Sequence, residues 1–237
     1  MTLIIKPKSE FEVCVEAEIT PEIARNLEDA KNFKVYLGKE ERRLEELFDL
    51  EFVDDREEKV ILKGDFSRVK WIGREMKGGE IIVEGNVGMH LGAFMEGGRI
   101  VVKGNCDDWV GGMMKGGEIV VEGDTGNRVG CNYWGESEGM KGGRIVIKGN
   151  AGNYIGEKMV DGEIVVEGNA GDFVGSEMKG GKIVVRGKAG YTGWDMKGGV
   201  IEVGECELSP SFVKDAEGVW RGDVNVKGEG VVRILQD

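Results

Sequence analysis

The sequence predicts an all-β solenoid: a right-handed parallel β-helix of about seven 19-residue coils, with a small α+β cap at its N-terminus. Three observations predict this fold class. A glycine-centred motif recurs at a nearly constant spacing, isoleucine and valine occupy the same two positions of every copy, and the charges beside them alternate in sign from copy to copy. Self-similarity at such a period is the sequence signature of stacked repeats.

Gly-Gly or Asp-Gly pairs set the period of the repeat. They fall at 78/79, 97/98, 116/117, 142/143, 161/162, 180/181 and 198/199, in steps of 19, 19, 26, 19, 19 and 18 residues. Each copy holds a five-residue alternating stretch, which is typical of a half-buried strand. Its second and fourth positions form two inward columns: Ile81, Ile100, Ile119, Ile145, Ile164, Ile183 and Ile201, and Val83, Val102, Val121, Ile147, Val166, Val185 and Val203.

The first and fifth strand positions point outward and alternate in sign. They are Glu80, Arg99, Glu118, Arg144, Glu163 and Lys182, and Glu84, Lys103, Glu122, Lys148, Glu167 and Arg186. Neighbouring strands lie about 4.8 Å apart, so stacked like charges would repel. The alternation therefore predicts that consecutive copies pair in register, with the usual right-handed crossover. It also predicts that the additional residues of the 26-residue step bulge out in "CNYWGESEG", residues 131–139.

The glycines raise the alternative of a phosphate-binding loop. A dinucleotide fingerprint occurs once, between a strand and a helix, whereas these glycines recur in every copy and belong to turns that are usually followed by Asn or Asp. Nucleotide binding is therefore not predicted. The methionine two residues before each pair could bind soft copper, but a flexible apolar side chain also fills a corner of the core, which we favour: Met76, Met95, Met114, Met140, Met159, Met178 and Met196.

Composition predicts three segments: an α+β cap over residues 1–58, the repeat over 59–204, and a closing segment over 205–237. In the first, Thr20 and Pro21 favour a helix over 21–31. The stretches "FEVCVEAEI" and "FKVYLG" are expected to be strands, and "ERRLEELF" a second short helix. A stacked repeat needs such end segments, because an open terminal unit exposes unpaired backbone.

Charge and composition exclude several classes of function. A formal charge of −12 argues against nucleic acid or an anionic membrane as partner. The sequence has neither an apolar run of roughly 18 residues nor a signal peptide, so we expect a cytoplasmic location. The four cysteines form no C-x-x-C pair and are expected to be reduced thiols. A single Gln, a single His and abundant Ile, Val, Glu and Lys resemble a protein from a thermophile.

Two outward stripes are unusual for a solvated surface. The third strand position is apolar in six copies: Ile82, Val101, Val120, Val146, Val165 and Val184. A second column is mostly aromatic: Trp71, His90, Trp109, Arg128, Tyr154, Phe173 and Tyr191. Aromatic residues with arginine are typical of a protein–protein contact. The alternative is that a terminal segment of the chain covers one or both stripes.

The candidate catalytic residues are few. His90 is the single histidine and could act as a general base, but no nucleophile or acid accompanies it in the pattern, so we expect an interface residue. Asp107, Asp108 and Asp172 could suggest polysaccharide cleavage, yet they are not grouped as an acid/base or calcium site. We therefore predict no catalytic residue and no metal site on this chain.

The repeat M-x-G-G-x-I-x-V-x-G-N-x-G-x-x-[IV]-G, with "ITPEIARNL" at 19–27 and "YLGKEERRLEELFDL" at 36–50, resembles the C subunit of formylmethanofuran dehydrogenase over almost the whole chain. The repeat portion is also similar to the C-terminal domain of the glutamate synthase large subunit and to the third subunit of the bacterial formyltransferase/hydrolase complex. Cys106-Asp107 and Asp161 depart from the motif, because glycines are expected at Asp107 and Asp161.

The resemblance implies membership of an archaeal complex that reduces CO2 with methanofuran to formylmethanofuran, a step of methanogenesis. It implies a scaffold that docks an amidohydrolase-like subunit. Molybdenum or tungsten pterin, iron–sulfur clusters and catalytic metal ions would lie on partner subunits, with none of these cofactors on this chain.

The insertion is the main candidate contact within this resemblance. We expect Asn132, Tyr133 and Trp134, with Arg128 and the aromatic column, to contact the partner or to line an approach for methanofuran, because functional loops sit on rigid scaffolds. Three other functions remain open at this point: a subunit of a formyltransferase/hydrolase complex, a glutamate-synthase-like module, and a stand-alone β-helix enzyme acting on carbohydrate or acyl groups.

Overall fold

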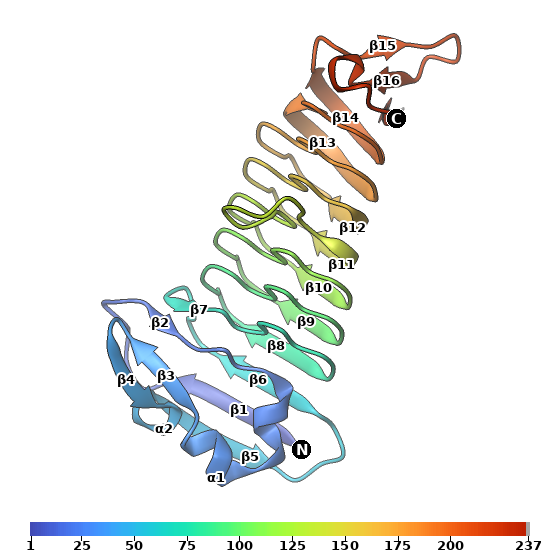
Figure 1. Ribbon diagram of the computed structural model, residues 1–237. Coiled ribbons are helices and arrows are strands. Elements are labelled where there is room, and N and C mark those ends of the chain that lie inside the picture. Colours follow the sequence, from blue (N-terminus) through green and yellow to red (C-terminus); the bar gives the residue numbers. More distant parts are fainter. Residues whose placement is uncertain (236–237) are drawn as a thin grey trace.

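The computed structural model describes residues 1–235 and shows an elongated molecule with the two termini at opposite ends (Figure 1). The helical elements are η1 (Pro21–Arg25), α1 (Leu27–Lys31), α2 (Leu44–Leu47) and η2 (Val224–Val226). The strands are β1 (Thr2–Pro7), β2 (Val15–Glu16), β3 (Lys34–Leu37), β4 (Glu40–Arg43), β5 (Phe48–Val53), β6 (Lys59–Lys63), β7 (Val69–Lys70), β8 (Glu80–Glu84), β9 (Arg99–Val102), β10 (Glu118–Val121), β11 (Lys141–Ile147), β12 (Asp161–Val166), β13 (Lys182–Thr192), β14 (Val200–Leu208), β15 (Val213–Lys214), β16 (Trp220–Gly222) and β17 (Gly230–Ile234).

One large mixed sheet dominates the fold. Its 13 strands follow the order β15-β16-β17-β14-β13-β12-β11-β10-β9-β8-β6-β1-β5, and a second sheet has the order β4-β3-β2-β7. The predicted fold class, an all-β right-handed parallel β-helix of about seven coils with a small α+β cap, is therefore wrong. The repeat columns specify only the strands that carry them, and the strands at both ends extend the same sheet with antiparallel as well as parallel pairs.

The predicted register of the repeat strands is confirmed. Glu80 pairs with Arg99, Arg99 with Glu118, and Glu118 with Arg144 across the 26-residue step. The pairing continues in parallel through β12 and β13. Alternating charge thus meets across each strand pair, as the sequence predicted. The division of the chain into segments 1–58, 59–204 and 205–237 stays a prediction.

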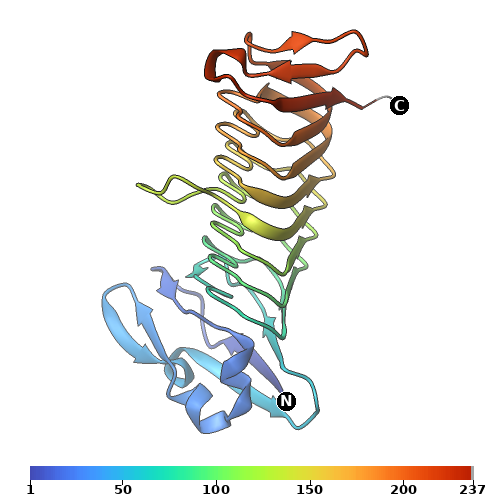
Figure 2. The same ribbon diagram turned by 45° about the vertical axis from the view of Figure 1, so that its right-hand side comes forward.

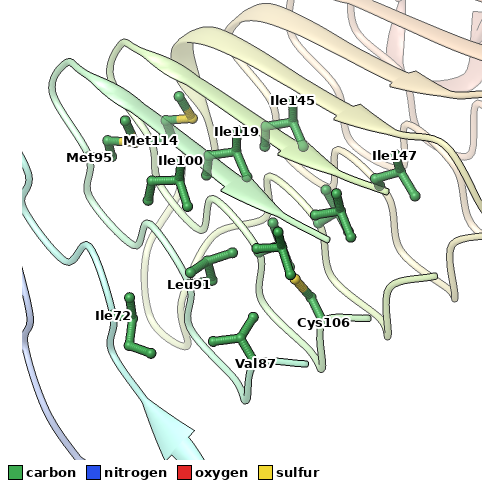
Figure 3. Packing of buried hydrophobic residues seen from close by; sticks show 14 of the residues in the cluster. Ile72, Val87, Leu91, Met95, Ile100, Cys106, Met114, Ile119, Ile145 and Ile147 are labelled. Carbon is green, nitrogen blue, oxygen red and sulfur yellow. The ribbon is translucent and has the colours of Figure 1, made fainter. Parts of the chain in front are cut away.

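The inward columns form a continuous core. The isoleucines and valines of the second and fourth strand positions and the seven predicted core methionines are fully buried. Figure 3 shows Ile100, Ile119 and Ile145 in one row. Leu91 of the facing segment completes the layer, and the residue that follows it is Gly92, with φ +62°. A Cβ atom on Gly92 would lie 2.5 Å from Ile119 Cδ1, so a side chain there would displace the core.

Side chains at the turns link successive copies through the backbone. Asn86 Oδ1 accepts from the N–H of Asn105 at 2.9 Å, and Asn105 Oδ1 accepts from the N–H of Asp124 at 2.8 Å. A second ladder starts at Asp108, whose Oδ1 accepts from the N–H of Asn127 at 2.7 Å. The Asn and Asp residues that follow the turn glycines therefore satisfy backbone donors of the next copy.

The N-terminal region matches the sequence expectations only in part. The expected helix over 21–31 is divided into η1 and α1 at Asn26, which has extended backbone and accepts from the N–H of Glu28 at 2.8 Å. The expected strand "FKVYLG" is β3, but "FEVCVEAEI" contributes only the two residues of β2. "ERRLEELF" begins as strand β4 and turns helical only in α2, because its first residues pair with β3.

Candidate functional site

The aromatic column, defined as Trp71, His90, Trp109, Arg128, Tyr154, Phe173 and Tyr191, lies along one side of the stacked copies. Its first six members have φ between 61° and 70°. A bulky residue in this left-handed region is strained by on the order of 1 kcal/mol, which glycine would avoid. The chain does use glycine two residues later in each copy. The bulky side chains are thus retained in spite of the strain, which points to a role in contacts.

The N-terminal half of the column is a closed aromatic cluster. The rings of Trp71 and His90 stack with centroids 4.0 Å apart, and His90 and Trp109 follow at 5.4 Å. Tyr133 of the insertion folds back over them and stacks on Phe94 at 5.2 Å. Its hydroxyl oxygen lies 3.0 Å from Nδ1 of His90, within hydrogen-bond distance. The insertion, rather than a terminal segment, therefore covers the first half of the column.

Burial keeps this hydrogen-bonded pair neutral. It lowers the pKa of His90 to about 4, and the positive charge of Lys70 acts in the same direction. Burial also raises the pKa of Tyr133. At neutral pH the imidazole is thus a weak base whose Nδ1 already has a partner. This arrangement favours a packing role for His90 over general-base catalysis.

Arg128 marks the boundary between the two halves of the column. Its guanidinium lies 5.4 Å from the ring centroid of Trp109, 4.8 Å from that of Tyr154 and 5.1 Å from that of Trp134. Nη1 of Arg128 also pairs with Glu157 at 2.7 Å, and the two side chains are only 19% and 15% exposed. The charge of Arg128 is therefore neutralised within the chain, and the ion pair is shielded from water by aromatic rings.

The insertion extends away from the long sheet in Figure 2, where it is drawn in yellow-green. Its base is held by several hydrogen bonds. The thiol of Cys131 donates to the carbonyl of Tyr154 at 2.6 Å, and Asn132 Nδ2 donates to the carbonyls of Tyr133 at 3.0 Å and Glu136 at 2.9 Å. Within this fixed loop the side chain of Trp134 is 82% exposed.

The C-terminal half of the column is open. Tyr154 and Phe173 stack at 5.0 Å, and Phe173 and Tyr191 follow at 6.0 Å. Trp194 meets Phe173 edge to face at 6.4 Å. Tyr191 and Trp194 are 44% and 43% exposed. This exposed apolar surface is the kind found at protein contacts.

Several residues of the site were missed from the sequence: Arg74, Phe94, Glu157 and Trp194. They lie three or four residues after members of the column, at positions with no residue type common to all copies. The only usable signal was their spacing from the column, because residues at a constant offset in a stacked repeat occupy the same side.

Unpaired polar atoms are concentrated on this side of the molecule. Within residues 1–235, four buried side-chain polar atoms have no hydrogen-bond partner, and three of them belong to Arg74, Trp109 and Asn132. Buried polar atoms are normally paired, so such a concentration needs an explanation. Arg74 and Trp71 also line a cavity of about 400 Å³ that reaches the second sheet.

The predicted apolar stripe on the long sheet behaves differently. Its valines lie between the two charge columns, and Val165 and Val184 are only 6% and 8% exposed. The flanking arginines pair along the sheet, as in the contacts of Arg99 Nε with Glu118 at 2.9 Å and of Arg144 Nε with Glu163 at 2.8 Å. The stripe is therefore buried at Val165 and Val184, whereas its other members stay partly exposed between the paired charges: Ile82, Val101, Val120 and Val146.

The other predicted features can be placed briefly. All four cysteines are free thiols, with Cys106 and Cys131 buried and Cys14 and Cys206 partly exposed. In the part of the chain that the structure describes, no three His, Cys, Asp or Glu residues are grouped as a metal site. Nor does any helix formed by residues 1–235 have the length and hydropathy of a membrane span.

The fold and the site define a β-rich repeat protein with a large, partly exposed aromatic face. The chain belongs to the GXGXG motif family, whose model matches residues 68–217. The matched residues include the repeat strands β8 to β14, the aromatic column and the insertion.

Three comparisons refine this assignment. The chain is 44% identical over 95 residues to the C subunit of the molybdenum-containing formylmethanofuran dehydrogenase 1 of Methanothermobacter marburgensis. That match covers 39% of this chain and spans only 24% of the length of the relative. The C subunit of a tungsten-containing formylmethanofuran dehydrogenase 2 of Methanothermobacter wolfeii is 41% identical over 97 residues, which cover 38% of this chain and 36% of that one.

A solved structure is similar over nearly the whole chain. It is the crystal structure of the formyltransferase/hydrolase complex from Methylorubrum extorquens in complex with methylofuran. The TM-score is 0.89 at 26% identity, and the match covers 99% of this chain and 100% of that one. The resemblance to the C subunit of formylmethanofuran dehydrogenase is confirmed by the names of the two Methanothermobacter relatives.

Proposed function

We propose that the chain is a non-catalytic scaffold and docking subunit of a formylmethanofuran dehydrogenase, the complex that reduces CO2 with methanofuran to formylmethanofuran. The single observation that carries this proposal is the structural likeness over 99% of the chain to one chain of a formyltransferase/hydrolase complex. The names of the curated relatives select the dehydrogenase. The proposal includes methanogenesis, an archaeal thermophilic source and a cytoplasmic location.

The partner in this proposal is the amidohydrolase-like subunit, with methanofuran nearby. Molybdenum or tungsten pterin, iron–sulfur clusters and catalytic metal ions are assigned to partner subunits. The names of the relatives, which include molybdenum and tungsten forms, support the first of these cofactors for the complex. On this chain, His90 and Cys131 are each engaged in an internal contact, which supports a structural role for both groups.

The docking surface consists of the aromatic column and the insertion, with Asn132, Tyr133 and Trp134. Two observations support this surface. The bulky residues of the column have a left-handed backbone that would cause no strain in glycine, and part of the column remains exposed. An aromatic, partly apolar surface on a rigid scaffold is suited to an obligate contact with another subunit.

A component of a formyltransferase/hydrolase complex is the second candidate, because the near-complete structural match is to such a complex. The two candidates differ in the reaction of the assembled enzyme. The first requires reduction of CO2 at a metal–pterin centre, and the second requires transfer or hydrolysis of a formyl group without that reduction.

Affinity purification of the natively tagged chain tests the proposal. We expect mass spectrometry to identify the other dehydrogenase subunits in fixed ratio. We also expect the purified assembly, supplied with methanofuran and a low-potential electron donor, to form formylmethanofuran from CO2. Formyl transfer without CO2 reduction would favour the second candidate. A chain that purifies alone would contradict both.

A further inference from the structure

We propose that Trp134 is the anchor through which the insertion enters an apolar pocket on a partner subunit, whereas the adjacent Tyr133 holds the insertion on its own chain. This inference rests on the proposed function and deepens it by naming the contacting residue and the chemistry of the partner surface.

The two neighbouring aromatic residues have opposite surroundings. Tyr133 packs among Phe94, Trp109 and His90 and shares a hydrogen bond with the imidazole. Trp134 is 82% exposed, the largest exposed fraction among the large hydrophobic side chains of residues 1–235. Removing an exposed indole from water gains far more than moving one that is already buried. Binding free energy is therefore available at Trp134 and not at Tyr133.

The loop that presents Trp134 is fixed before any partner binds. Besides the bonds of Cys131 and Asn132, Lys179 Nζ donates to the carbonyl of Ser137 at 2.8 Å, and the N–H of Gly139 donates to the carbonyl of Lys158 at 2.8 Å. The indole itself lies over the guanidinium of Arg128. A preorganised aromatic side chain loses little conformational entropy on binding, which is characteristic of hot-spot residues.

The charges around the indole define the partner. Arg128 is already paired with Glu157, so the partner needs no carboxylate at the base of the loop. Glu138 is likewise paired, with Lys141 at 3.0 Å and Lys179 at 3.8 Å. Glu136 is exposed, and within residues 1–235 it makes no ion pair. The complementary surface is therefore an apolar pocket with a basic residue at its rim.

Other occupants fit this charge pattern less well. A second copy of the chain, docked loop against loop, would bring two Glu136 carboxylates together. An anionic lipid surface would be repelled by the same carboxylate and by the net charge of −12. A different polypeptide of the complex is the occupant to which the inference commits.

The test measures binding of full-length chains to the complex of the remaining dehydrogenase subunits, purified without this one. We expect Trp134→Ala to raise the Kd by roughly 30-fold or more, as for a hot-spot residue. Glu136→Lys should raise it by several-fold. Val213→Ala removes another exposed hydrophobic side chain, 59% exposed in β15 and outside the column and the insertion, and is the matched control, with an expected change below about threefold. Thermal unfolding of Trp134→Ala should match the wild type, because the side chain is exposed.

The outcomes separate the anchor from the proposed function. If the wild-type chain binds and Trp134→Ala binds equally well, the anchor is wrong and the docking function stands. If the wild-type chain does not bind these subunits, both are wrong. Two further results would overturn the anchor alone. One is a dimer of the isolated chain that Trp134→Ala dissolves, and the other is Trp134-dependent binding to phosphatidylcholine–phosphatidylserine vesicles.

Discussion

The long sheet and the aromatic column are two outer surfaces of the same stacked repeat, yet their charged side chains are paired and exposed to water in different ways. On the sheet, Arg99 and Arg144 each bridge carboxylates of the strands on both sides, and all these side chains are 28% to 49% exposed. In the column, Arg128 forms an ion pair with Glu157, and its guanidinium also lies close to three aromatic rings. Both charges are shielded from water. The sheet surface repeats the same Arg–Glu pair from strand to strand, whereas the column brings different residue types together in one site.

The two surfaces also differ in how their polar groups are satisfied. The sheet surface satisfies its polar groups through the period itself, since every added copy supplies the opposite charge. The column leaves strained backbone, unpaired buried polar atoms and an exposed tryptophan. Features that the repeat does not need for folding are the ones that indicate contact with another molecule.

The largest expected effect is the difference in unfolding free energy between two variants, each of which lacks an arginine of one surface. Arg128→Ala leaves the shielded carboxylate of Glu157 without its partner and should lower the free energy of unfolding by on the order of 3 kcal/mol. Arg144→Ala removes two exposed ion pairs and should lower it by at most about 1 kcal/mol. Urea unfolding of both variants checks this. Equal losses would mean that the two surfaces do not differ as described.

A somewhat smaller effect is expected at Tyr133. Tyr133→Ala should destabilise the chain by roughly 2–3 kcal/mol, because a largely buried aromatic ring is removed from the cluster. Tyr133→Phe keeps the ring and removes only the hydroxyl bonded to His90, so about 1 kcal/mol is expected. Thermal and urea unfolding measure both values. If Tyr133→Ala were neutral, the insertion would not be held by this residue.

His90, in the closed half of the column, should titrate at an unusually low pH. The chain has a single histidine, so one imidazole resonance in an NMR titration reports its pKa directly. We expect a value of about 4, well below the usual 6.5. Because the unfolded chain then binds the proton more readily between about pH 4 and 6.5, His90 makes the protein less stable as the pH falls through that window. A pKa near 6.5 would show that His90 is exposed to water.

The smallest effect is expected on the sheet. The hydrogen bond from Arg99 is the main reason that the pKa of Glu118 lies below its ordinary value, with Arg144 contributing as well. The stabilisation from this carboxylate is therefore present above its unfolded pKa and is lost as the pH falls through the lower folded value. Glu118→Gln should cost at most about 1 kcal/mol at pH 7, and less at high salt. A large loss that salt does not reduce would contradict an exposed, screened network.

The sequence predicted those parts of the fold that repeat. Alternating charge from Glu80 to Lys182 placed every strand of the repeat in the correct register, including the step across the insertion. The pairing of β5 with β1, and of β16 with β17, lies outside the period and depends on long-range contacts. No periodic signal specifies such pairs, and the fold class was wrong for that reason.

The candidate site, like the fold, was predicted only where its residues repeat. The column emerged from its constant position in each copy, but the ring of Phe94 and the carboxylate of Glu157 stand at positions with no shared residue type. The opposite orientations of Tyr133 and Trp134 could not be predicted, because the insertion occurs once and has no neighbouring copy to compare. Only the packing of Tyr133 on His90 and Phe94 distinguishes the two residues.

We expect the aromatic column and the insertion, rather than the long sheet, to face another subunit. Hydroxyl-radical footprinting of the isolated chain and of the purified complex, read by mass spectrometry, tests it most directly. We expect strong protection of Trp134, Tyr191 and Trp194 in the complex, with unchanged labelling of Ile82 and Val101 on the sheet. Protection of the sheet residues with Trp134 still fully labelled would contradict it.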